Sequence, residues 1–240
     1  MIEMVRRFLR QRFGSPAMAI ALAVLALLTA VQAAMSDPER ALGAGFLALA
    51  LITAGSVSRD ASGGALQMIL ARPIRRTSYL FGRYLGILTA YAVFLAGACG
   101  LTVLFAQTLP KLLRATSDGF SFVSLGRGAA TAMANALLFA AILLFFSTLL
   151  SGYADVLAYL LLSIGLGLLP GLGDSLGKPW LRQAGEAIRK NVLPEVEWGE
   201  VFRGQNILSE PTGRYVLAVT AFLVLAAVRF SRREFAYGND

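Results

Sequence analysis

Apolar residues gather in long uninterrupted blocks along this chain, and the polar and charged residues fall between the blocks. Six uncharged apolar runs follow one another: Pro16–Ala34, Ala41–Val57, Tyr84–Leu109, Ala129–Leu150, Val156–Leu172 and Tyr215–Val228. A helix needs about 20 residues to cross the hydrocarbon core, with about 17 as the lower limit. The last run is shorter, and it reaches that length only if Arg214 and Arg229 extend to the headgroups. The pattern predicts an all-α integral membrane protein with six transmembrane helices in one domain, 1–240.

A basic amphipathic helix is predicted before the first apolar run. From Met1 to Phe13, apolar residues repeat at helical spacing on one face, while Arg6, Arg7, Arg10 and Arg12 occupy the rest. Such a helix lies in the headgroup plane of a membrane. A signal peptide is the alternative, but five more apolar runs follow and no clear small-residue cleavage site ends the first one.

Lys and Arg residues are unequally distributed between alternate loops. Four lie in the N-terminal segment, five between the second and third runs, and three at the C-terminal end. The loop Ser36–Arg40 has one and the loop Pro110–Gly128 has three, while the six in the long loop 173–214 are balanced by acidic residues. The positive-inside rule therefore places both termini and the segment 58–83 in the cytoplasm and the loop 173–214 outside. We expect a multi-pass protein of the plasma membrane, the inner membrane of a bacterium.

The outer loop 173–214 is expected to contain a helix that starts at Pro179. Its tryptophans, Trp180 and Trp198, suit a membrane interface. A helix that caps the outer mouth of the bundle is the favoured interpretation, and a substrate-recognition surface is the alternative. Glycines on both sides of Pro170 predict a broken or loosened end of the fifth helix, since non-helical backbone is tolerated in a membrane where it faces protein or a cavity.

Composition excludes several classes of protein. The chain is 57% apolar, and its mean hydropathy is +0.66, which exceeds that of soluble domains. It has no histidine and one cysteine, Cys99, so His-ligated zinc or haem, Ser-His-Asp hydrolysis and a thiolate metal cluster are excluded, and no metal site is expected. The net charge of +8 flanks the apolar runs, which indicates membrane lipids rather than a nucleic acid as the partner.

We expect no nucleotide site in this chain, because its one candidate phosphate-binding loop does not match the motif. Gly171–Pro179, GLGDSLGKP, superficially resembles a phosphate-binding loop, but G-x-x-x-x-G-K-[ST] requires glycine at Leu172 and a hydroxyl at Pro179. We therefore expect no enzyme activity and no cofactor bound by this chain.

Polar residues inside the apolar runs give a second expectation. The runs contain no Asp, Glu, Lys or Arg, which disfavours an ion-coupled transporter. Most of their other polar side chains are expected to form interhelical hydrogen bonds, and Gln32, Gln107 and Asn135 are the candidates for lining a substrate path. Gly82-x-x-x-Gly86 predicts a close helix contact, and Asp155 is expected to cap the fifth helix on the cytoplasmic side.

One charged, glycine-interrupted segment, Gly55–Gly86, separates the second and third runs. Within it, Ala65–Leu70 is expected to form a short helix that begins after Gly63 and Gly64, and Pro73 ends that helix. The apolar positions of the short helix are Leu66, Ile69 and Leu70, and the basic residues that follow it are Arg72, Arg75, Arg76 and Arg83.

The segment Asp60–Arg83 resembles the signature of ABC-2 type permeases, the membrane subunits of ABC exporters. That signature runs E-x-x-x-G-T-L-E-x-L-L-x-x-P-[IVL]-x-R, with G-K after a short spacer. Asp60 matches the acidic start, Gly64-Ala65-Leu66-Gln67 the G-T-L-E core, Ile69-Leu70 the apolar pair, Pro73-Ile74 and Arg76 the end, and Gly82-Arg83 the G-K. Ala65 stands in place of threonine and Gln67 in place of glutamate. The six runs, the amphipathic start and the long outer loop also look like this family, so the resemblance covers essentially the whole chain.

The resemblance implies that Ala65–Leu70 is a coupling helix that fits a cleft on a separate ABC ATP-binding subunit, which would hold ATP and Mg²⁺. The residues implied to contact that subunit are Asp60, Gly64, Leu66, Gln67, Ile69, Leu70, Pro73 and Arg76. The family also implies a homodimer of this chain that exports an amphipathic or hydrophobic substrate, such as a lipid, glycolipid, peptide or drug. A family branch that supports assembly of periplasmic metalloenzymes shares the GG-x-L stretch. A non-transporting membrane anchor or sensor that recruits a cytosolic partner is the alternative from another class.

Overall fold

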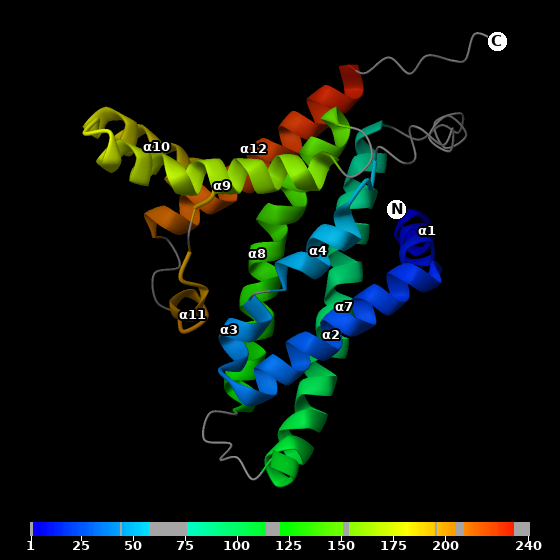
Figure 1. Cartoon of the computed structure of the whole chain (residues 1–240). Coiled ribbons are helices and arrows are strands. Elements are labelled where there is room, and N and C mark those ends of the chain that lie inside the picture. The colour runs from blue at the N-terminus through cyan, green and yellow to red at the C-terminus, as the bar shows by residue number, and fades with distance from the viewer. Residues whose placement is uncertain are drawn as a thin grey trace, which may run out of the picture. The chain divides into compact units, whose positions relative to one another are not determined.

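The computed structural model describes residues 2–43, 45–57, 76–113, 121–150, 154–194, 196–204 and 209–232, and every element within these ranges is an α-helix (Figure 1). The helices are α1 (Ile2–Phe13), α2 (Pro16–Met35), α3 (Pro38–Gly43), α4 (Phe46–Thr53), α7 (Arg76–Leu113), α8 (Phe122–Leu149), α9 (Ala154–Ser175), α10 (Pro179–Val192), α11 (Trp198–Val201) and α12 (Glu210–Arg232). In this part of the chain, five helices are long and apolar enough to cross a membrane, namely α2, α7, α8, α9 and α12. The predicted all-α membrane class is confirmed.

The second predicted span, Ala41–Val57, differs from the expectation because the structure divides it between α3 and α4. Neither helix is long enough to cross a membrane by itself. The Gly45 N–H donates to the Leu42 carbonyl at 3.1 Å, so the chain turns before α4 begins. A Cβ atom at Gly45 would lie 2.7 Å from the hydroxyl oxygen of Tyr91, so a side chain at this position would force the buried Tyr91 to shift. Six unbroken transmembrane helices are therefore not confirmed.

The described residues fall into two compact units, residues 1–53 with 78–140 and residues 54–77 with 141–240. Helix α8 continues from the first unit into the second, and α7 begins in the second unit with Arg76 and Thr77. In the first unit, the Tyr84 hydroxyl of α7 donates to the Leu137 carbonyl of α8 at 2.9 Å. The rings of Phe46 and Phe139 lie 5.4 Å apart and join α4 to α8.

The motif Gly82-x-x-x-Gly86 forms the predicted close helix contact, and its partner is α1. A Cβ at Gly82 would lie 2.9 Å from the Met4 sulfur, and one at Gly86 would lie 3.0 Å from the ring of Phe8. Arg83, between the two glycines, places its guanidinium carbon 5.3 Å from the centre of the Phe8 ring. Helix α1 spans Ile2–Phe13, within the predicted range Met1–Phe13, and part of its apolar face is covered by α7.

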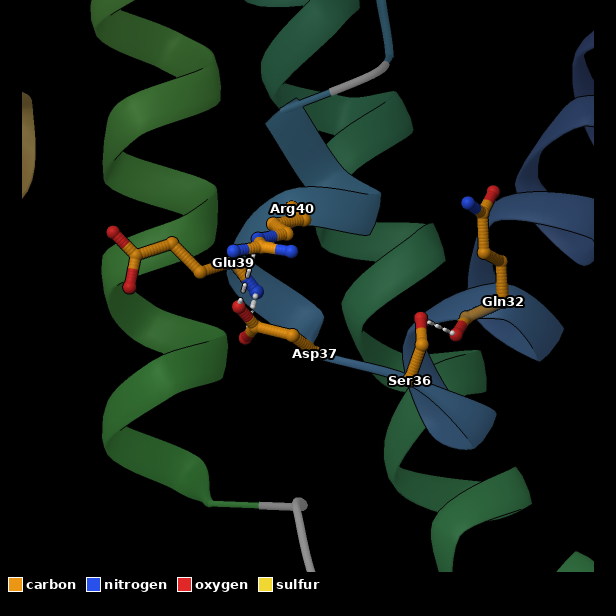
Figure 2. Close-up of polar contacts among 5 residues, drawn as sticks. All are labelled: Gln32, Ser36, Asp37, Glu39 and Arg40. Carbon is orange, nitrogen blue, oxygen red and sulfur yellow. Dashed lines mark hydrogen bonds and ion pairs between the residues drawn. The ribbon is translucent and has the colours of Figure 1, made fainter.

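The corner between α2 and α3 is closed by short polar contacts (Figure 2). The Ser36 hydroxyl donates to the Gln32 backbone carbonyl at 2.7 Å. The Asp37 carboxylate accepts the Glu39 N–H at 3.1 Å, which satisfies a free amide in the first turn of α3. Gly128 of α8 lies against this turn, since a Cβ there would be 2.8 Å from backbone atoms of α3.

In the second unit, α10 folds back along the end of α9 (Figure 1). A Cβ at Gly185 of α10 would lie 2.8 Å from Leu169 and 3.3 Å from the Pro170 ring, so the two helices approach closely. Helix α9 continues through Pro170 to Ser175, and the predicted break at its end is wrong. The predicted start of the loop helix at Pro179 is confirmed.

Candidate functional site

The predicted coupling segment is described at its two ends. Most of the residues predicted to contact the ATP-binding subunit lie outside the described residues, namely Asp60, Gly64, Leu66, Gln67, Ile69, Leu70 and Pro73. Arg76 is described and is the first residue of α7. The site that the structure defines therefore consists of the residues on either side of the segment 58–75, namely Gly55–Val57 and Arg76.

The first end is held by Asp155. The Gly55 N–H donates to Asp155 Oδ2 at 2.8 Å, and the other carboxylate oxygen accepts the Val156 N–H at 2.8 Å. Gly55 has φ +63°, in the left-handed region that favours glycine. The Asp155 side chain is fully buried. Asp155 lies one residue inside α9 rather than at its cap, so the expected capping role is replaced by a bond to a distant part of the chain.

Ser147 of α8 holds the same turn two residues later. The Val57 N–H donates to Ser147 Oγ at 3.0 Å, and Ser147 is also fully buried. Ser56, between the two anchored amides, is 2% exposed. A buried backbone N–H that loses its partner costs free energy comparable to a lost hydrogen bond. The two side chains therefore satisfy the amides of a buried non-helical turn and fix its position on α8 and α9.

The other end of the segment is attached to α12. Arg76 Nη1 donates to the Ser231 carbonyl at 2.9 Å. Ser231 lies in the last turn of α12, where carbonyl groups have no partner within the helix and the helix dipole favours a cation. The described residues on both sides of the segment 58–75 are thus bound to helices of the second unit: Gly55 and Val57 to α9 and α8, and Arg76 to α12.

The three residues predicted to line a substrate path have different environments. The Gln32 side chain is exposed and extends away from the α2–α3 corner, where only its backbone carbonyl is used (Figure 2). Gln107 of α7 is exposed, and Asn135 of α8 is half-buried. The assignment of these three residues to a substrate path stays a prediction.

Sequence reasoning predicted Asp155 as a helix cap and included Ser147 only among the polar side chains of the apolar runs, so it missed what both residues bind. Their partners are 100 and 90 residues away in the sequence. The signal in the sequence was the position of Asp155 directly before the apolar run Val156–Leu172. That position is typical of a helix cap and does not indicate a bond to Gly55.

Metal ligands do not cluster in the described ranges, since these contain no group of three or more His, Cys, Asp or Glu side chains that could hold an ion. In comparisons with known proteins, no family model and no curated protein matches this chain.

Proposed function

We propose that this chain is the transmembrane permease subunit of an ATP-driven transporter of the ABC-2 type. The resemblance of Asp60–Arg83 to the family signature supports this proposal, as do the membrane-type helices. The observation that carries it is the attachment of both ends of the segment 58–75 to helices long enough to cross a membrane. If the segment 58–75 moves, the residues on both of its sides transmit that movement to α8, α9 and α12, because they are bound to these helices.

The proposed mechanism starts with Ala65–Leu70 seated on a separate ATP-binding subunit. A change in that subunit moves the segment, and the buried bonds of Gly55 and Val57 pass the movement to α9 and α8. The Arg76 bond passes it to the last turn of α12. Only contacts that differ between the two states of the ATP-binding subunit shift the conformational equilibrium of the permease. Since Arg76 binds Ser231, we assign it to holding the segment as well as to the partner contact.

In this proposal, the chain still crosses the membrane six times, and the second crossing is interrupted between α3 and α4. Gly128, near the start of α8, lies against Pro38 and Glu39, whereas Ser147, in the last turn of the same helix, binds Val57. We assign α3 and α4 together to one passage. Both termini and the segment 58–83 are then cytoplasmic, and the loop 173–214 is outside, as the charge distribution favours.

The complete transporter in this proposal contains two copies of this chain and two ATP-binding subunits in a bacterial inner membrane. Each copy offers one coupling helix. Its substrate is an amphipathic or hydrophobic molecule, and ATP and Mg²⁺ bind to the partner. A role in periplasmic metalloenzyme assembly is the variant within the family, and a membrane anchor that recruits a cytosolic protein is the alternative outside it.

Purification of the tagged chain from its native membrane in mild detergent tests the proposal. We expect a polypeptide with a complete G-x-x-x-x-G-K-[ST] motif to co-purify, together with ATP hydrolysis. A double variant, Leu66→Asp with Ile69→Asp, should lose both, because it places carboxylates on the apolar face of the coupling helix.

Leu176→Asp is the matched control, since Leu176 is an exposed leucine in the loop 173–214 and is expected outside the cell. It should retain the partner and the hydrolysis. Undiminished association and hydrolysis in the double variant would reject the coupling helix. Association with a protein that hydrolyses no nucleotide would favour the anchor.

A further inference from the structure

A groove lies between the end of α10 and the start of α12 in the second unit. Its volume is about 540 Å³, within the range of small-molecule sites. The residues that line it are Glu186, Arg189, Lys190, Leu193, Pro194, Glu210, Pro211 and Arg214. The leucine and the two prolines form an apolar part, and the remaining side chains are charged.

On the α10 side of the groove, positively charged side chains outnumber negatively charged ones: Arg189 and Lys190 against Glu186. Glu186 is bound by Arg182 Nε at 3.0 Å, and Arg182 is not among the lining residues. Glu210 is bound by Arg214, one helical turn away. The Lys190 side chain forms no ion pair or hydrogen bond with the other described residues, and it follows Arg189 in the sequence. Both carboxylates therefore already have cationic partners, while the ammonium group of Lys190 is exposed.

Aromatic residues indicate the depth of this groove in a membrane. Trp198 packs edge-on against Tyr215 of α12, with ring centres 4.9 Å apart. Trp180, at the start of α10, is 63% exposed. Trp and Tyr concentrate where a membrane meets water. Glu210 and Arg214 lie in the first turns of α12, before Tyr215, so a membrane crossed by α12 would place the groove at the level of its headgroups.

We propose that this groove binds the phosphate-bearing headgroup of an anionic phospholipid. The phosphate lies next to Lys190 and Arg189, and the glycerol and the first carbons of the acyl chains lie against Leu193, Pro194 and Pro211. Near a membrane surface, each basic residue contributes about 1 kcal/mol to the binding of anionic lipid. The site requires that the chain be embedded in a membrane, and it stands whether or not the chain is a permease.

Lipid binding to the full-length chain in nanodiscs tests the site. Fluorescent phosphatidylglycerol and phosphatidylcholine are the probes, in nanodiscs of unlabelled phosphatidylcholine. We expect the chain to bind phosphatidylglycerol more tightly, and Lys190→Glu to weaken that binding at least about fivefold, since the variant removes a cation and adds an anion. Lys178→Glu makes the same charge change on an exposed residue outside the groove and should leave the affinity unchanged.

Soluble glycerol 3-phosphate distinguishes a lipid from a free phosphate. We expect millimolar glycerol 3-phosphate to leave bound phosphatidylglycerol in place. Displacement by it would overturn the assignment to a lipid. Equal affinities for the two lipids, or equal weakening by the Lys190 and Lys178 variants, would overturn the site itself. Equal melting temperatures of the two variants establish that the comparison is between folded proteins.

Discussion

Asp155 accepts the backbone N–H of Gly55 at 2.8 Å although the two residues are 100 positions apart. This contact places a fully buried carboxylate at the point where α4 gives way to the predicted coupling segment. The amide it satisfies cannot reach water, so the bond is expected to contribute more to stability than an exposed contact of the same kind.

Asp155→Ala should therefore destabilise the protein by about 1.5–3 kcal/mol, because it leaves a buried amide without an acceptor. The measurement is an SDS unfolding titration of the purified protein. Asp37→Ala is the control, since Asp37 also accepts a backbone N–H, at 3.1 Å, but its side chain is half exposed. Its effect should stay below about 1 kcal/mol. Equal effects of the two variants would contradict a special role for the Asp155 contact.

Gly128→Ala should destabilise the contact between α8 and α3. The added Cβ would lie 2.8 Å from the Pro38 carbonyl oxygen and from the Glu39 Cα, and backbone atoms cannot move aside as a flexible side chain can. Overpacking of this kind costs about 1–3 kcal/mol. The same titration detects the loss as a lower midpoint.

Gly126→Ala provides a control of opposite sign, because a Cβ at Gly126 meets nothing within 4 Å. Alanine is favoured over glycine within a helix by about 1 kcal/mol, so this variant should be neutral or slightly more stable. A loss of stability at Gly126 as large as that at Gly128 would show that α8 tolerates no substitution here, for a reason other than the α3 contact.

Gly86→Val should displace α1 from α7. A Cβ at Gly86 lies 3.0 Å from the Phe8 ring, and the branched valine adds two methyl groups at this point. Faster hydrogen exchange of the amides of residues 2–13, measured by mass spectrometry, is the expected result, because α1 loses the contact that holds it.

Gly97→Val, on the same helix, should leave that exchange unchanged, because a Cβ at Gly97 would meet no neighbouring atom within 4 Å. If α1 exchanges equally in both variants, its position does not depend on the glycine pair.

Cysteine labelling in intact cells tests the orientation of the chain. In a background with Cys99→Ala, a cysteine at Gln183, an exposed residue of α10, should react with a membrane-impermeant maleimide added outside. A cysteine at Arg6, an exposed residue of α1, should react only after the cells are permeabilised. The reverse pattern would place the coupling segment outside and would reject the proposed function.

Helices that are marked by a continuous apolar run or by a proline at their start could be predicted from the sequence. Uninterrupted apolar blocks gave α2, α8 and α9, and the proline at position 179 gave the start of α10. Glycines around Pro170 were misleading, because α10 packs against this part of α9 through Gly185 and the helix stays continuous. Glycines in a sequence indicate that the backbone is flexible there. They do not indicate whether a neighbouring helix packs against that part of the chain.

Features that depend on long-range contacts were not predictable from the pattern. The run Ala41–Val57 is apolar enough for a membrane helix, and hydropathy does not register the turn at Gly45 beside Tyr91. The bonds of Asp155 and Ser147 to the turn at Gly55–Val57 join residues that lie far apart in sequence. No local periodicity connects such residues, so their pairing appears only when the chain is folded.

The interruption between α3 and α4 also bears on how the protein is made. Gly45 lies against Tyr91, and Phe46 against Phe139, so the side chains that receive this part of the chain belong to helices synthesised later. During synthesis, α3 and α4 therefore leave the ribosome before the two aromatic residues that contact Gly45 and Phe46, namely Tyr91 of α7 and Phe139 of α8. Nascent chains truncated before Tyr91 would lack both of the aromatic residues that contact Gly45 and Phe46.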